Sequence, residues 1–165
     1  MAVEASLIEA LDALGIASTV HEHEAVFTVE ESVSLHKEIA GAHTKNMFLK
    51  DSGGQFWLIT IPHDIRADLK KLPLIIGSKK LSFGKAEDME RLLGISPGSV
   101  TPLAAFNDNG GLVRIVIDGK LAAAERVNIH PLRNTATISI TGQDLLTALQ
   151  AWDHAPQIVD VPVAS

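Results

Sequence analysis

The first signal along the chain is a helical spacing of apolar residues. Val3, Leu7, Leu11 and Leu14 fall on one helical stripe, and Gly15 follows them as a residue suited to end a helix. Thr28 and Glu31 form a capping box that predicts a second helix. The segments predicted as helices after the first one are 29–39, 67–72 before Pro73, 86–93 before Gly94, and 142–152 after Thr141.

Runs of β-prone residues lie between these helices. The clearest pair, 46–50 and 55–61, is joined by Asp51-Ser52-Gly53-Gly54 and predicts a β-hairpin. The apolar run 112–117 is typical of a central strand covered on both faces. Other short strands are predicted at 17–22, 79–83 and 135–140, and the tail 154–165 is expected to be irregular. Intermixed strands and helices favour an α/β or α+β sheet with peripheral helices.

Length and composition indicate one soluble globular domain. The chain has 165 residues, of which 46% are hydrophobic and 21% charged. Because it has no cysteine, disulfides, thiolate zinc sites, iron–sulfur clusters and cysteine nucleophiles are excluded. No apolar run reaches the ~18 residues that a membrane span needs, and the amino terminus carries acids where a signal peptide carries lysines. We therefore expect a cytoplasmic protein.

The net charge of −6 is spread unevenly. Between Arg66 and Arg91 lie seven of the fourteen basic residues and only four acids, so this stretch carries +3 and the rest of the chain −9. Such a cationic strip can contact a few phosphates without strong, indiscriminate binding to nucleic acid. The alternative is a solvated helix face without a partner.

The common catalytic signatures are absent from the sequence. It has no G-x-S-x-G elbow, no phosphate-binding P-loop and no dinucleotide fingerprint. The run 21–24 reads His-Glu-His-Glu, but no second cluster completes a metal site, so we interpret it as an exposed strand end and expect no metal or other cofactor. His36, His43, His63 and His154 suggest no role, and Trp57 is expected in the core.

Three other features combine residue types that bind phosphate, carbonyl or ribose groups. Lys45-Asn46 enters a predicted strand, where a lysine can hold a phosphate or a carbonyl oxygen. Gly98 to Pro102 form a G-x-x-x-P loop whose amides can make a rigid cradle. His130 is followed by Pro131 ahead of a predicted strand edge. Each feature alone is more often structural than functional.

The order of these motifs resembles a known family. K-N-x-F-L, then L-G-I-S-P-G-S-V-T-P, V-I-D-G-K-L and H-P-L-R-N-T-A-T are similar to the YbaK-type aminoacyl-tRNA deacylases, and most similar to free-standing bacterial relatives of the prolyl-tRNA synthetase editing domain, which clear Ala-tRNA(Pro). The resemblance runs from about Ala5 to Leu149. It implies a single domain with a mixed, strongly curved sheet, or a partly open barrel, flanked by helices.

The resemblance also assigns roles to residues. Lys45 matches the family's essential lysine, Asn46 its polar neighbour and His130 the histidine of the H-P motif. Phe27 and Val29 fall where the family lines its amino-acid pocket. The loop expected to face the substrate consists of Gly98, Ser99, Val100, Thr101 and Pro102, and the lysines expected to touch the tRNA acceptor stem are Lys70, Lys71, Lys79 and Lys80.

The reaction that the resemblance implies is hydrolysis of the ester that joins alanine to tRNA(Pro). A pocket too small for proline would spare Pro-tRNA(Pro), which complements a synthetase pocket that cannot strongly reject the smaller alanine. The expected partner is the acceptor end of tRNA(Pro), with a synthetase or elongation factor as a candidate transient partner, and no membrane or metal. Two alternatives are a non-catalytic RNA- or DNA-binding module and a hydrolase of small aminoacyl esters.

Overall fold

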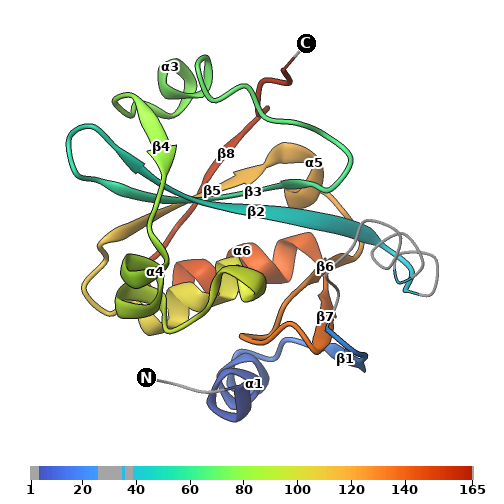
Figure 1. The fold of residues 1–165 in the computed structure, drawn as a ribbon. Coiled ribbons are helices and arrows are strands. Elements are labelled where there is room, and N and C mark those ends of the chain that lie inside the picture. Colours follow the sequence, from blue (N-terminus) through green and yellow to red (C-terminus); the bar gives the residue numbers. More distant parts are fainter. Residues whose placement is uncertain (1–3, 26–34, 36–38, 165) are drawn as a thin grey trace.

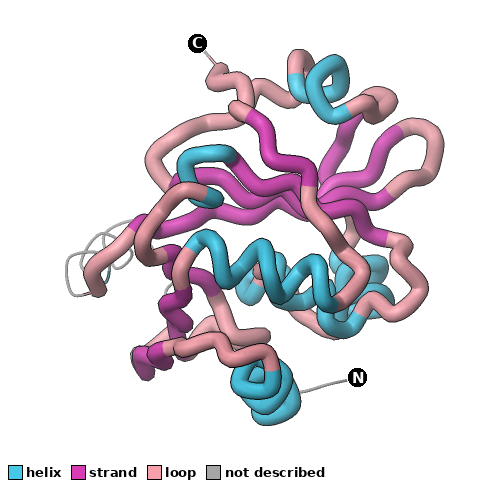
Figure 2. The backbone as a smooth tube through the Cα atoms, turned by 180° about the vertical axis from the view of Figure 1, so that it is seen from behind, coloured by secondary structure: helices cyan, strands magenta, loops and turns pink. Residues whose placement is uncertain are grey.

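The computed structural model describes residues 4–25, 35 and 39–164 as helices on both sides of a curved sheet (Figures 1 and 2). The helices are α1 (Glu4–Ala13), α3 (Leu72–Ile76), α4 (Ala86–Leu93), α5 (Gly119–Ala122) and α6 (Gly142–Ala151), with 3-10 turns η1 (Pro97–Ser99) and η2 (Pro102–Asn107). The strands are β1 (Thr19–Glu22), β2 (Ala42–Asp51), β3 (Phe56–Pro62), β4 (Leu81–Phe83), β5 (Val113–Asp118), β6 (Val127–Ile129), β7 (Ala136–Ile140) and β8 (Gln157–Val159). Within these residues, no helix is long and apolar enough to cross a membrane.

The eight strands form one mixed sheet that does not close into a barrel. Their order is β1-β7-β6-β2-β3-β5-β8, and β4 pairs with β2 off this path. The pairs β2–β6, β3–β5 and β5–β8 are parallel, and the other pairs are antiparallel. This confirms a single domain with a mixed sheet and flanking helices, in the open form.

Alternation of side chains along the strands builds a core on each face of the sheet. On one face, Phe48, Leu58 and Ile117 pack with α1, α4, η2 and α6. On the other face, Leu49 and Ile59 pack with the short helix α3. Figure 1 shows α4 and α6 below the β2–β3–β5 layer and α3 above it. The expectation that 112–117 is a central strand is confirmed, since β5 lies between β3 and β8.

The predicted hairpin forms between β2 and β3, and Asp51 organises its turn. One carboxylate oxygen of Asp51 accepts hydrogen bonds from the N–H groups of Gly53 and Gln55, and the other accepts from the indole of Trp57 and the N–H of Lys79. Burial alone would raise the pKa of Asp51, but these hydrogen bonds outweigh it and lower the pKa. Trp57 is buried, as expected.

Most other predicted elements are present, with two corrections. The helix predicted over 67–72 is wrong, because α3 begins at Leu72 and carries Pro73 in its first turn. Proline is tolerated there because the first helical N–H groups have no partner within the helix. The tail 154–165 is not wholly irregular, since β8 extends β5 and Ala67 bridges Val163.

The remaining differences concern short or undescribed segments. The elements α5 and β6 have no counterpart among the predictions; they span four and three residues, too few to show a period. Most of the helix predicted over 29–39, including its capping box, lies outside the described residues. The predicted helix cap at Thr141 is confirmed, because its hydroxyl accepts a hydrogen bond from the N–H of Asp144.

Candidate active site

A gap between two strands on one edge of β2 creates the place where the candidate residues lie. On that edge, β6 pairs with Ala42 and His43, and β4 pairs with Leu49 to Asp51. No strand among the described residues pairs with 44–47 on this edge. The sheet therefore splits beside Lys45 and Asn46, and Figure 1 shows β6 and β7 turning away from β2.

Lys45 and His130 occupy corresponding positions on the two sides of this split. Lys45 lies two residues beyond the last β2 residue paired with β6, and His130 lies two residues beyond its partner, Asn128. Alternation places Lys45 on the side of β2 that carries His43, and His130 on the side of β6 that carries Asn128. The side chains of His43 and Asn128 meet, with 3.5 Å between Nε2 and Nδ2, so the ammonium and the imidazole share one side of the split.

The Lys45 ammonium is exposed and held by the backbone of a neighbouring loop. Its Nζ donates a hydrogen bond to the carbonyl oxygen of Ile65 at 2.7 Å. A single neutral acceptor leaves the ammonium's other two N–H groups for a ligand oxygen. Lys45 thus presents an accessible cation at the gap in the sheet.

Asn46 lies on the opposite side of β2 from Lys45. Its Oδ1 accepts a hydrogen bond of 2.7 Å from the hydroxyl of Thr60, a fully buried residue on the neighbouring strand β3. This bond fixes which way the amide points, because the oxygen must face the hydroxyl. The register therefore separates the adjacent residues Lys45 and Asn46 onto the two sides of one strand.

The imidazole of His130 is half-buried and arranged to stay neutral. Burial lowers its pKa, the hydrogen bond to the carbonyl of Ala136 raises it, and the nearby charge of His23 lowers it, with a net lowering. Nδ1 lies 3.3 Å from the Ala136 carbonyl, which can only accept, so Nδ1 carries the proton. The lone pair then resides on Nε2, which can accept a proton or a hydrogen bond.

The G-x-x-x-P loop reaches the segment that carries His130. A Cβ added to Gly98 would lie 3.2 Å from Nδ2 of Asn134, four residues after His130, so a side chain at position 98 would push against this amide. Ser99, Thr101 and Pro102 are buried, and the Thr101 hydroxyl accepts the N–H of Leu103 to cap η2. The side chains of these three residues hold the loop, and Gly98 is its exposed backbone.

The remaining predicted residues are distributed as follows. Phe27 and Val29 lie outside the described residues. The four lysines expected to touch tRNA are exposed and flank α3: Lys70, Lys71, Lys79 and Lys80. Lys79 and Lys80 lie beside the β2–β3 turn, where the N–H of Ser52 donates to the carbonyl of Lys80. The end of β2 beside these two lysines lies six residues from Lys45, or ~20 Å along the strand.

Polar residues that the sequence left without a role contribute most to the surroundings of the site. His23 lies 2.9 Å from the hydroxyl of Thr137 and 2.7 Å from the carbonyl of Glu24. Glu22 forms an ion pair with Arg133, at 2.6 Å between Oε1 and Nη2. His43 is buried and its Nε2 lies 2.7 Å from the carbonyl of Ile39. The contacts of His23 with Thr137 and of Glu22 with Arg133 join residues far apart in the sequence, so the local sequence carried no signal for them.

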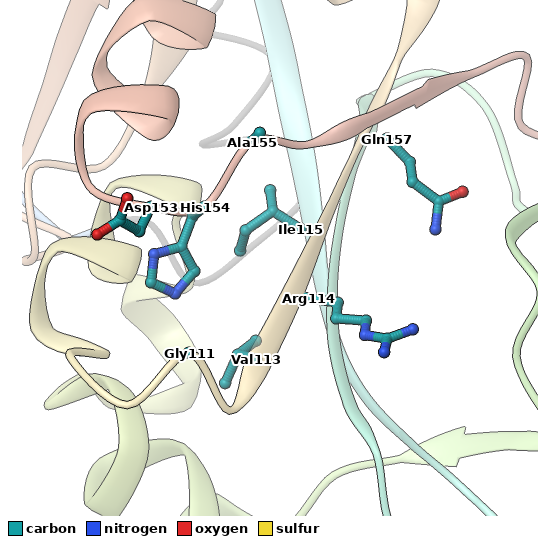
Figure 3. A pocket seen from close by; sticks show the side chains of 8 residues that line it. All are labelled: Gly111, Val113, Arg114, Ile115, Asp153, His154, Ala155 and Gln157. Carbon is teal, nitrogen blue, oxygen red and sulfur yellow. The ribbon is translucent and has the colours of Figure 1, made fainter.

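A separate pocket of about 400 Å³ lies beside β5. Figure 3 shows residues of 111–115 and 153–157 around it, with Arg114 and Gln157 extending to the same side of the strand. His154, at its wall, is buried and bound to Asp108 at 2.9 Å. Neither Lys45 nor His130 lines this pocket.

The sequence of residues 23–148 matches the family of aminoacyl-tRNA editing domains. The chain belongs to this family. The match includes Lys45, the G-x-x-x-P loop and His130. The pairing of β2 with β6 places Lys45 and His130 at corresponding positions, and the 130–135 segment that carries His130 lies close to the loop. Editing of this kind removes an amino acid from tRNA, so this editing domain is an aminoacyl-tRNA deacylase, a hydrolase of the ester bond.

The sequences of related proteins align with nearly the whole editing domain. Prolyl-tRNA synthetase associated domain-containing protein 1 of Bos taurus is 38% identical over 96% of this chain and 95% of its own length. The prolyl-tRNA editing protein ProX of Acetoanaerobium sticklandii is 35% identical over 92% of this chain and 93% of its own length. A crystal structure described as a candidate trans-editing enzyme for prolyl tRNA synthetase has the same fold, with a TM-score of 0.74, 20% identity and 99% coverage of both chains.

Proposed function

We propose that this editing domain hydrolyses mischarged Ala-tRNA(Pro) in trans and spares Pro-tRNA(Pro). The observation that carries the proposal is the paired placement of Lys45 and His130 across the split between β2 and β6. The similarity to a protein named for prolyl-tRNA editing, over more than nine-tenths of both chains, supports tRNA(Pro) as the carrier. The partner is the acceptor end of that tRNA.

The protein needs no strong nucleophile, because an aminoacyl ester is already activated toward attack by water. Lys45 supplies an accessible cation for the terminal phosphate or for the developing oxyanion. His130, neutral with its lone pair on Nε2, accepts a hydrogen bond from the attacking water or from the ribose 2′-hydroxyl. The exposed backbone at Gly98 lies close to Asn134, in the segment that carries His130.

Discrimination against proline follows from size under this proposal. A synthetase pocket built for proline loses only ~1–3 kcal/mol when alanine lacks the extra methylenes, so it cannot exclude alanine strongly. A second pocket that is too small for the pyrrolidine ring removes this error, since proline does not enter. Phe27 and Val29 are the residues proposed to form its wall.

Comparing three substrates tests the proposal. We expect turnover of Ala-tRNA(Pro), at least ~100-fold slower turnover of Pro-tRNA(Pro), and little turnover of alanine ethyl ester, which lacks the tRNA that positions the ester. Equal cleavage of both tRNAs would contradict the size argument. Efficient cleavage of the free ester would favour a small-ester hydrolase, and tRNA binding without any turnover would favour a non-catalytic binding module.

A further inference from the structure

Arg133 makes a complete set of hydrogen bonds beside the candidate active site. Its guanidinium donates to both carboxylate oxygens of Glu4 (2.6 and 3.2 Å), to both of Glu22 (2.8 and 2.6 Å), and to the hydroxyl of Thr135 (2.8 Å). A guanidinium has five N–H groups, so five acceptors match its full capacity. We call Arg133, Glu4, Glu22 and Thr135 the Arg133 clamp.

The clamp ties the segment between β6 and β7 to two other elements. Glu4 is the first residue of α1, Glu22 is the last residue of β1, and Thr135 directly precedes β7. Arg133 lies between His130 and Asn134, the two residues of this segment that the site uses. Two bidentate pairs fix both the position and the plane of the guanidinium, and through it the path of this segment.

The segment needs to be held in place because one of its residues has an unfavourable backbone conformation. Leu132 has a φ of 72°, in the left-handed region that a leucine rarely adopts. A conformation of this kind persists where the surroundings determine it, and such residues cluster at functional sites. The Leu132 side chain packs on the core and the neighbouring Arg133 is clamped, so both sides of the segment are held.

Stability alone does not require the clamp to lie in the segment that carries His130. The Glu22 side chain is 70% exposed, and those of Arg133 and Glu4 are 32% and 28% exposed, so the clamp is partly open to water. The exposed Glu22 pair contributes little to folding. Their pKa values nevertheless reflect a close pairing, since the hydrogen bond to Arg133 lowers that of Glu22, and the bonds to Glu22 and Glu4 raise that of Arg133.

We propose that Arg133 is a positioning residue of the active site, which holds the 130–135 segment so that Nε2 of His130 faces the substrate and Asn134 stays against Gly98. It acts through these residues and does not itself touch the ester. The proposal rests on the proposed function for its catalytic consequence, while its structural consequence concerns the protein without tRNA.

The test uses Arg133→Gln in the full chain, with two readouts. We expect kcat for Ala-tRNA(Pro) to fall about 10- to 100-fold, as for a displaced catalytic group, with KM changed less than ~3-fold. In nitrogen NMR of the tRNA-free protein, His130 should change from a Nδ1-protonated ring to a mixture of tautomers. Arg133→Lys keeps the charge but not the fork, so it should restore neither readout.

A matched control and a second variant keep the outcome decisive. Arg91→Gln removes an exposed arginine–carboxylate pair, with Asp88 at 2.9 Å, and should leave kcat and the His130 spectrum unchanged. Glu22→Gln weakens half of the clamp at an exposed position and should give a smaller change in both readouts. This variant tests the proposal if Arg133→Gln fails to fold.

Unchanged kcat, or lost kcat with an unchanged His130 spectrum, overturns the proposal. If the wild type does not cleave Ala-tRNA(Pro), the proposed function fails, and the His130 spectrum still tests the clamp.

Discussion

Two charged arrangements join loops to the sheet in this editing domain, toward opposite ends of its strand order. The Arg133 clamp lies beside β1 and β7 and is partly open to water. The Asp108–His154 pair lies beside β5, with side chains only 3% and 4% exposed. Asp108 also accepts the N–H groups of Leu112 and Val113, and His154 donates from Nδ1 to the carbonyl of Trp152.

The difference between them predicts that the buried pair serves folding and that the clamp, under the proposed function, serves catalysis. The buried pair satisfies backbone groups that water cannot reach, so removing it leaves unpaired polar atoms in the core. Removing the clamp leaves no polar group unpaired in the core, because its partners can turn to water. The pair has no hydrogen bond to those predicted site residues that the structure describes, whereas the clamp holds the segment that carries His130. Substitutions at the two ends should therefore affect different measurements.

The largest expected effect is on catalysis, at Lys45 on the central strand β2, beside the split that separates it from His130. Lys45→Ala should lower kcat/KM for Ala-tRNA(Pro) by about 100- to 1000-fold, the size expected when one electrostatic group at the reacting centre is removed. Stability in urea should not change, because the ammonium is exposed and its hydrogen bond is to a loop carbonyl. Lys50→Ala, an exposed lysine of the same strand whose Nζ lies 5.2 Å from the Phe56 ring centre, is the matched control. Near-normal activity of Lys45→Ala would exclude lysine from the reaction.

The converse effect is expected at the Asp108–His154 end. Asp108→Ala should lower the free energy of unfolding by about 3–5 kcal/mol, since it strands a buried histidine and two backbone N–H groups. Asp108→Asn keeps acceptor capacity and should cost less. Urea denaturation measures both, and kcat of the folded fraction should match the wild type. A loss of kcat with stability intact would remove the distinction between the two ends.

The sequence predicted elements wherever several residues share one period or one turn signal. The hairpin between β2 and β3 follows from its glycine turn, and α4 from Met89, Leu92 and Leu93 at helical spacing. The sequence misled at α3, because Pro73 suits the first turn of a helix as well as the position after one. The strand β8 is three residues long, and its place depends on the free edge of β5, which local sequence does not encode.

For the candidate site, the motifs proposed residues but not the relation between them. That Lys45 and His130 lie at corresponding positions on the two sides of the split depends on a parallel pairing of only two residues between β2 and β6. The role of Glu22 and Arg133 was not visible either, because their contact joins positions 111 residues apart. Long-range register and ion pairs arise from the tertiary fold, so they appear only once it is known.

A smaller effect concerns pH at His130, in the segment that the clamp holds. Because burial lowers the pKa of His130, and the like charge of His23 lowers it further, kcat/KM should fall only when the pH drops below the usual histidine range near ~6.5. His23→Gln removes the like charge, so the acidic limb should move to higher pH. The buried Asp108–His154 end gives the control: Asp108→Asn should leave the limb in place. A limb that does not move in His23→Gln would show that His23 does not act on the catalytic group.

The smallest effect is expected from the lysines near the β2–β3 turn, which lie at neither end of the comparison. The double reversal Lys79→Glu and Lys80→Glu should weaken tRNA binding and reduce the dependence of log Kd on log salt by about one to two units, because up to two phosphate contacts are lost. The chemical step should stay as fast, since both lysines are ~20 Å from Lys45 along β2. Reversal of Arg91 and Lys120 changes the net charge equally at other exposed positions and controls for long-range attraction. Equal weakening by the two double variants would mean that tRNA responds to the overall charge of the domain and makes no local contact with Lys79 and Lys80.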